Sequence, residues 1–340
     1  MPHIKDYLRE FLHSINQNPI SEMLFEKEII RKSKLPLTSI HELVNKIGIF
    51  SPFTKELYRQ NDYYGHASVI KKYLKISGDY QFKFAIDHGI VFSKNTNQLG
   101  TDSTIPSAVT FGKYQQCILK TYKPNIYCIG PYIHYAESLY CDEEIYKMRK
   151  KLGTTLLVFP SHSTPSDTVE YDYRELVNKI QIAGKKFQTI RVCIYWSDVL
   201  RGVDEIYRKA GFECVTAGHV YDPNFLPRLK SIILLSDYAM GNGVGSNVGY
   251  CIYMNKPYQI MWQEEKLSGH HKAIKIIEDE TSSKGFREVI KTLNKFSNKV
   301  TTKQKEIIGY YWGFDEIKSP SKLGEIIRNS EANYQNSTND

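Results

Sequence analysis

The sequence lacks any hydrophobic run close to the roughly 20 residues that a membrane-spanning helix needs. Its first ten residues are polar, so we expect no signal peptide. The six cysteines form no CxxC pair, and most lie in apolar segments where cysteine acts as a small hydrophobic residue. These features predict a cytoplasmic protein with reduced thiols. Peripheral contact with the inner face of a membrane is compatible with the net charge of +8.

Motifs that define several common sites are also missing. The chain contains no DxD motif and no GxSxG nucleophile motif. It has no cluster of Lys and Arg interleaved with aromatic residues. We therefore predict no metal site, no bound cofactor and no nucleic-acid partner.

The length of 340 residues is more than one hydrophobic core usually serves, so two domains are expected. Apolar runs and helical periodicity alternate along both halves. They predict strands over 81–86, 107–111, 125–129, 155–159, 189–195, 213–217 and 258–262, and a further strand over 47–53. They predict helices within 1–45 and over 67–74, 114–122, 173–183, 199–210, 224–233, 248–254 and 322–328.

This alternation predicts an α/β fold with two Rossmann-like domains that face a cleft. We assign residues 1–145 to an N-terminal domain and residues 146–308 to a second domain. Residues 309–328 are expected to form an aromatic segment and a helix that return to the first domain. Residues 329–340 are polar and are expected to form a disordered tail.

The glycine-rich stretch from Gly241 to Gly249 is the centre of the functional prediction. Glycine lets a backbone approach a ligand closely, and a helix that begins after such a loop directs free N–H groups at an anion. Gly245, Ser246 and Asn247 lie where this helix would begin, so they are candidate phosphate ligands. The alternative is an ordinary capped connection, because the spacing matches neither GxGxxG nor a P-loop.

Three strand ends in the second half carry glycine, histidine or small polar residues. The residues that we select there, besides Gly245, Ser246 and Asn247, are Ser161, His162, Ser163, Gly218, His219 and Asn242. Right-handed crossovers would bring these loops to one edge of a parallel sheet. Hydroxyls, imidazoles and backbone N–H groups in one cleft suit an anionic, hydroxyl-rich ligand. Each histidine taken alone could equally be a structural residue.

Asp87 and His88 follow a predicted strand in the first half. Ligands in open α/β sheets bind just beyond the carboxyl ends of the strands, so either side chain could act as a general base there. The alternative is that Asp87 caps a turn and His88 is a structural loop residue.

As an ordered set, these motifs resemble those of GT-B glycosyltransferases, and most closely the enzymes of bacterial capsule, O-antigen and related surface-polysaccharide synthesis. The matching motifs are Asn61-Asp62-Tyr63-Tyr64-Gly65-His66, Asp87-His88-Gly89, Phe159-Pro160-Ser161-His162-Ser163, Ala217-Gly218-His219-Val220-Tyr221-Asp222 and Gly245-Ser246-Asn247-Val248-Gly249-Tyr250 with Lys256-Pro257.

The resemblance implies a second domain that binds a nucleotide-sugar donor and a first domain that binds the acceptor and supplies the base. It implies that Gly245, Ser246 and Asn247 contact the donor phosphate, and that His162, Ser163 and His219 contact the donor. Asp87 or His88 would be the base. The expected reaction is inverting and metal-independent, with a glycan or a lipid-linked glycan as acceptor.

Three other functions are compatible with the same motifs. A polyol-phosphate transferase or a sugar-nucleotide 2-epimerase would keep the fold and change the reaction. A non-catalytic GT-B module would serve as a scaffold in a polysaccharide assembly complex.

Overall fold

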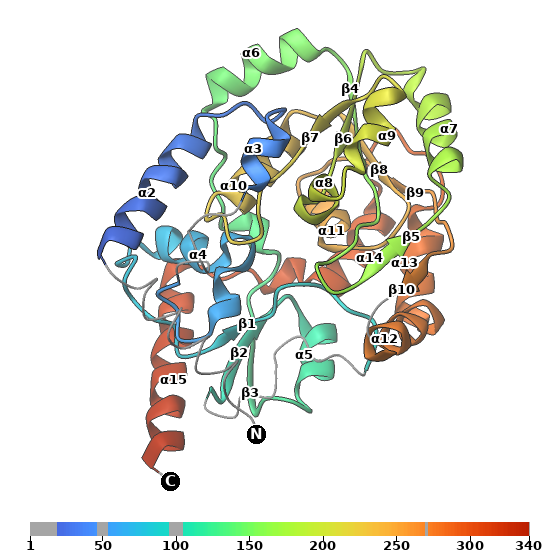
Figure 1. Cartoon of the computed structure of the whole chain (residues 1–340). Helices are drawn as coiled ribbons and strands as arrows, with labels where there is room; N and C mark the ends of the chain where they lie inside the picture. Colours follow the sequence, from blue (N-terminus) through green and yellow to red (C-terminus); the bar gives the residue numbers. More distant parts are fainter. Residues whose placement is uncertain (1–18, 46–53, 95–104, 269–270, 340) are drawn as a thin grey trace, which may run out of the picture.

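The computed structural model describes residues 19–45, 54–94, 105–268 and 271–339 (Figure 1). Two parallel sheets with helices around them confirm the α/β class. The strand predicted over 47–53 and the first 18 residues lie outside the described part of the chain. Helix α2, Pro19–Ser33, begins the described region.

The smaller sheet has the order β1-β2-β3, and its strands are β1 (Ala85–Ile86), β2 (Ser107–Thr110) and β3 (Asn125–Cys128). All its pairings are parallel. Helix α5, Lys113–Leu119, connects β2 to β3, and helix α4, His66–Leu74, precedes β1. Strand β1 is shorter than predicted. The Asn61 side chain forms hydrogen bonds with the backbone of this segment: Nδ2 donates to the Phe84 carbonyl (2.9 Å), and Oδ1 accepts from the Ile86 N–H (2.7 Å).

The larger sheet has the order β7-β6-β4-β8-β9, and all its pairings are parallel. Its strands are β4 (Thr155–Phe159), β6 (Thr189–Cys193), β7 (Glu213–Val215), β8 (Tyr238–Gly241) and β9 (Tyr258–Ile260). The chain runs outward from β4 to β7 and then returns to β8 on the other side of β4. Loops that leave β4 and β8 therefore diverge and open a crevice at the carboxyl ends of the strands.

The helices of this region are α7 (Tyr173–Gly184), α8 (Trp196–Leu200), α9 (Asp204–Lys209), α10 (Phe225–Leu234) and α11 (Ser246–Tyr253). The single helix predicted over 199–210 is wrong, because α8 and α9 are separated at Gly202, which has a φ of +75°. Two short strands, β5 (Thr168–Glu170) and β10 (Lys266–Ser268), pair antiparallel beside the larger sheet.

The hydrophobic core is continuous between the two sheets. One cluster contains Phe111 near the small sheet together with Leu157 and Ala239 of the large sheet. Leu156, Val158 and Met240 alternate with these residues along their strands and belong to a second cluster on the opposite face. The two halves are therefore packed against each other and not merely linked.

The chain crosses between the halves several times (Figure 1). Helix α6, Asp142–Leu152, connects β3 to β4. Helix α3, Ile40–Val44, lies in the first 145 residues but packs on α8 of the second half. The carbonyls of Leu37 and Leu43 accept the N–H groups of Thr216 and His219, both at 3.3 Å.

Helices α12 (His271–Ser282), α13 (Lys284–Leu293) and α14 (Thr302–Trp312) follow the large sheet. Helix α15, Pro320–Asn339, then packs on the first half, where the Tyr80 hydroxyl donates to Glu331 Oε1 and Asn333 Nδ2 donates to Tyr127 Oη (3.2 Å). The prediction of a disordered tail over 329–340 is wrong for the described residues, because this helix continues through Asn339. Among the described residues no helix is long and apolar enough to cross a membrane.

Candidate functional site

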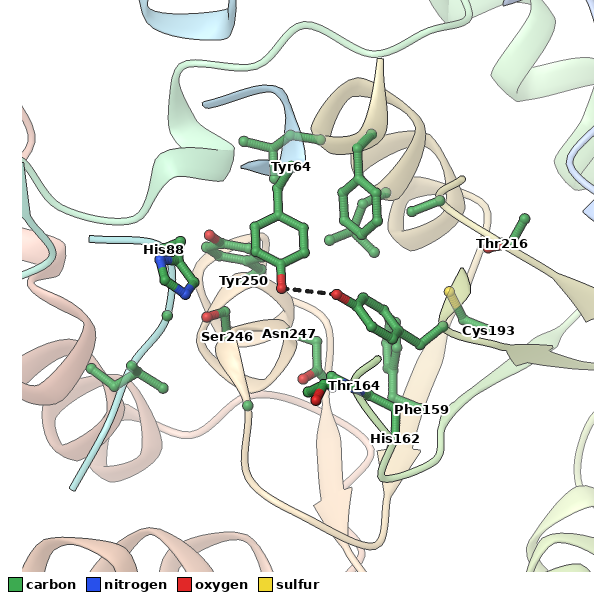
Figure 2. Close-up of a pocket in the computed structure, with 18 of the residues that line it drawn as sticks. Tyr64, His88, Phe159, His162, Thr164, Cys193, Thr216, Ser246, Asn247 and Tyr250 are labelled. Carbon is green, nitrogen blue, oxygen red and sulfur yellow. Dashed lines mark hydrogen bonds between the residues drawn. The ribbon is translucent and has the colours of Figure 1, made fainter. Parts of the chain in front are cut away.

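A cavity of about 450 Å³ lies between the two halves, at the carboxyl edge of the large sheet. We call it the first chamber. The residues that follow β4, β6, β7 and β8 contribute to its wall, among them Pro160, Tyr195, Ala217 and Gly245. It is thus placed at the crevice where ligands bind in open parallel sheets. Across the view in Figure 2, Ser246 and Asn247 lie between His88 on one side and His162 on the other.

Helix α11 begins in the wall of the first chamber. Gly245 is its N-cap, and Gly245, Ser246 and Asn247 all line the cavity. Asn247 Nδ2 donates to the Tyr258 hydroxyl (2.9 Å), whereas the Ser246 hydroxyl makes no hydrogen bond within the described part of the chain. The first N–H groups of a helix carry partial positive charge and lack partners within the helix, so this wall is suited to an anion.

The opposite wall comes from the turn Asn61–His66 of the first half. Tyr64 has a φ of +59° and Gly65 a φ of +70°, both left-handed. The Tyr64 N–H donates to the Val220 carbonyl (2.6 Å), and a Cβ on Gly65 would overlap the backbone of Pro223. The strained turn therefore fits closely on the second half and directs the Tyr64 ring into the chamber, where its hydroxyl lies 3.1 Å from that of Tyr195 (Figure 2).

Three imidazoles line the first chamber. Burial lowers the pKa of His66 to about 3 and that of His88 to about 4, and the Nδ1 atoms of both rings are buried without a hydrogen-bond partner. His162 stacks on Tyr195, with ring centroids 3.9 Å apart, and keeps part of its surface exposed to solvent. Desolvation by the surrounding protein still lowers its pKa, and the charge of Asp198 opposes this shift. All three rings are therefore neutral at pH 7, and they offer hydrogen bonds without positive charge.

A second chamber of about 420 Å³ adjoins the first and shares Phe159, His162, Asn247 and Glu280 with it. The Ser161 hydroxyl, which lines only the second chamber, donates to Glu265 Oε1. Trp262 contributes an aromatic surface to the same wall. The two chambers thus share part of their wall, which is aromatic and polar.

Asp87 does not line either chamber. It is fully buried, and its Oδ2 accepts a hydrogen bond from the Thr110 hydroxyl (2.7 Å). Burial raises the pKa of Asp87 to about 7, although hydrogen bonds from Thr110, Gly89 and Gln115 oppose this shift. Of the two candidate bases, the structure brings only His88 to the cavity.

Four other selected residues lie behind the cavity wall. The Ser163 hydroxyl accepts from the Val169 N–H (3.1 Å), and the buried His219 ring packs on Trp196 with centroids 4.3 Å apart. Asn242 joins two loops, because its Oδ1 accepts from the Ser161 N–H (2.7 Å). Gly218, with a φ of +96°, leaves space for the buried ion pair of Arg228 and Asp222. These residues shape the site but have no surface in it.

Several cavity residues are absent from the sequence-based selection: Tyr64, His66, Tyr195, Tyr250 and Glu280. The turn Asn61–His66 was a sequence signal for two of them, since its aromatic and glycine residues precede a helix. Tyr195 follows a predicted strand and could have been selected by the rule that identified His162. Glu280 lies on a polar helix, and no local pattern distinguishes it from its neighbours.

Comparison with known protein families and with curated protein sequences finds no match for this chain. Within the described residues, no group of three or more His, Cys, Asp or Glu side chains is arranged to hold a metal ion. The six cysteines are free thiols.

Proposed function

We propose that the chain is a glycosyltransferase of the GT-B type, with two Rossmann-like halves and a nucleotide-sugar donor bound between them. The observation that carries the proposal is the start of α11 at the crevice of the large sheet, with Gly245, Ser246 and Asn247 in the cavity wall. A nucleotide sugar presents a phosphate, and this wall presents helix N–H groups and a hydroxyl.

In the proposed reaction an acceptor hydroxyl attacks the anomeric carbon of the donor sugar, and the bond from that carbon to the phosphate oxygen breaks. Negative charge then grows on the leaving phosphate. The N-terminus of α11 and the Ser246 hydroxyl are in position to stabilise this charge, and preorganised groups of this kind usually provide the largest part of the rate enhancement.

The lining also suits the rest of such a donor. Tyr64, Tyr195 and His162 offer flat rings for a nucleobase or a sugar face, and the neutral imidazoles offer hydrogen bonds to hydroxyls. The acceptor that we propose is a surface-polysaccharide or glycolipid hydroxyl. We assign the reaction to the cytoplasm, because six free thiols suit a reducing compartment.

A thermal-shift screen against UDP, GDP, CDP, CMP and dTDP tests the donor site. A ligand at 100 times its Kd stabilises the native state by about 2.7 kcal/mol, so one of these nucleotides should raise the Tm. Ser246→Ala should reduce the shift, and Ser337→Ala, on the exposed side of α15, is the matched control. No shift with any nucleotide would contradict the proposal. Product analysis with and without acceptor then separates transfer from epimerisation.

A further inference from the structure

The two chambers raise the question of which group takes the proton of the attacking hydroxyl. Asp87 has no surface in the cavity. His88 lines the first chamber, but with a pKa lowered to about 4 it binds a proton only weakly at pH 7. Glu265 lines the second chamber alone and is engaged by the Ser161 hydroxyl. Asp87 therefore lacks access to the cavity, His88 lacks the strength of a base, and Glu265 has no surface in the first chamber and already accepts the Ser161 hydroxyl.

We propose that Glu280 of α12, in the second half of the chain, accepts the proton of the attacking hydroxyl. The inference rests on the proposed function and departs from the expectation that the first half supplies the base. Of the described residues that line the first chamber, Glu280 alone carries a carboxyl group, and none carries an ammonium or guanidinium group. Glu280 also lines the second chamber, so it lies where the two spaces meet.

The position of Glu280 is fixed from the opposite half of the molecule. Its Oε1 accepts the N–H of Phe92 at 2.7 Å, and the neighbouring N–H of Ser93 adds a second backbone interaction. Phe92 is itself buried against Phe286, with ring centroids 6.0 Å apart. A carboxylate held in this way loses little further freedom when a substrate binds, which favours a defined direction of proton transfer.

The surroundings also adjust the strength of this base. Burial raises the pKa of Glu280 to about 7 and the negative charge of Glu265 adds to the rise, while the Phe92 and Ser93 N–H groups oppose it. Tyr114 also lies near Glu280: burial raises the pKa of this phenol, and the Glu280 charge adds to the rise. A general base is most effective when its pKa lies near the working pH.

In the proposed step one proton is transferred, one bond forms at the anomeric carbon and one bond to it breaks. The acceptor oxygen forms a bond to the anomeric carbon while its hydrogen passes to the Glu280 carboxylate. The bond between the anomeric carbon and the phosphate oxygen breaks, and its electron pair leaves with the phosphate at the N-terminus of α11. The second chamber gives the acceptor a place beside Glu280 when the donor fills the first. Its wall of Ser161, Thr164 and Glu265 suits a hydroxyl-rich group.

The test compares Glu280→Gln with Glu278→Gln, a matched control on the exposed side of the same helix. The full chain is incubated with UDP-, GDP-, dTDP- and CMP-linked sugars, with water or p-nitrophenyl glycosides as acceptors, and released nucleotide is measured. Glu280→Gln should lower the release rate by about 10²–10⁴-fold. Nucleotide binding should be unchanged and the variant should fold, because the Gln carbonyl can still accept the Phe92 N–H. Glu278→Gln should behave as the unsubstituted chain.

The pH profile separates a proton acceptor from a structural residue. The unsubstituted chain should become more active as pH rises through about 7, where Glu280 ionises, and Glu280→Gln should lose this rise. Glu280→Asp keeps a carboxylate, so its activity should still rise with pH, although its rate of nucleotide release should be lower. This variant provides the test if Glu280→Gln does not fold. Normal turnover in folded Glu280→Gln would overturn the inference and leave the proposed function intact. If the unsubstituted chain neither binds nucleotide nor releases it, the proposed function fails, and the inference fails with it.

Discussion

The hydroxyl of Tyr64 lies 3.1 Å from the hydroxyl of Tyr195, and this hydrogen bond joins the two halves of the molecule inside the first chamber. Tyr64 reaches this position from a left-handed backbone conformation, and Tyr195 reaches it as the N-cap of α8, two residues after β6. A pair of phenols thus spans the space in which we propose that the donor binds.

This pair should contribute measurably to stability. Tyr64→Phe and Tyr195→Phe each remove the hydrogen bond and keep the ring, so each should lower the free energy of unfolding by about 0.5–1.5 kcal/mol. The double variant should cost less than the sum of the two, because the same bond is lost in each. Urea unfolding measures these values. Tyr146→Phe, at an exposed position, is the control, and strictly additive effects would show that the bond contributes nothing.

Ser246 is the most direct test of anion binding at α11. Its hydroxyl lines the cavity and makes no hydrogen bond within the described residues, so Ser246→Ala should leave the fold unchanged. Loss of one hydrogen bond to a charged phosphate should weaken nucleotide binding by about 1.5–3 kcal/mol. Isothermal titration calorimetry with the nucleotide found by thermal shift measures this loss. Equal affinity in Ser246→Ala would place the phosphate elsewhere.

Asp87 should make the stability depend on pH. Its pKa is about 7 in the folded state and about 4 in the unfolded chain. The folded state therefore holds an extra proton between these values, and the contribution of Asp87 to stability falls as pH rises from about 4 to about 7. Asp87→Asn lacks this titration, so its stability relative to the unsubstituted chain should rise over that range.

The same variant tests the role of Asp87 in turnover. Because Asp87 is buried outside both chambers, Asp87→Asn should keep nucleotide release within a few-fold of the unsubstituted rate. Chemical unfolding at several pH values and the release assay provide the two measurements. A large loss of release with intact folding and binding would restore Asp87 as a candidate base.

Gly249 determines how closely α11 approaches α14. A Cβ at this position would overlap the indole of Trp312, which is fully buried. Gly249→Ala should therefore lower the free energy of unfolding by about 1–3 kcal/mol, as overpacking usually does. Because the displaced helix carries Ser246, nucleotide binding should weaken as well. Gly78→Ala, where a Cβ meets nothing within 4 Å, is the control and should be neutral or slightly stabilising.

Local sequence signals predict those elements whose stability is largely local. Strand β4 has the predicted bounds, because its run of apolar residues is buried along nearly its whole length. Helix α7 begins at Tyr173 as predicted, where Asp172 Oδ1 accepts the Glu175 N–H (2.9 Å). By contrast, β1 is shortened by the side chain of Asn61, a residue more than 20 positions away that no local window includes.

The site, like the fold, is predicted from the sequence only where it depends on local features. Gly245, Ser246 and Asn247 line the cavity. They could be selected from the sequence because a glycine-rich loop and a helix start are local features. The topology rule places the loop that follows each strand at the correct edge, but it does not say which side chain points inward. His162 faces the chamber, whereas the His219 ring packs on Trp196. Glu280 reaches the site only through the packing of α12 on the loop at Phe92.

The exchange of terminal segments between the halves limits how this molecule can be divided. If the gene were divided at α6, one fragment would contain Leu37 and Leu43. The other would contain Thr216 and His219, their hydrogen-bond partners. The same division would separate Tyr80 from Glu331. Neither fragment would retain its full packing surface, so recombinant production of a single half requires grafting the missing helix, α3 or α15, onto it.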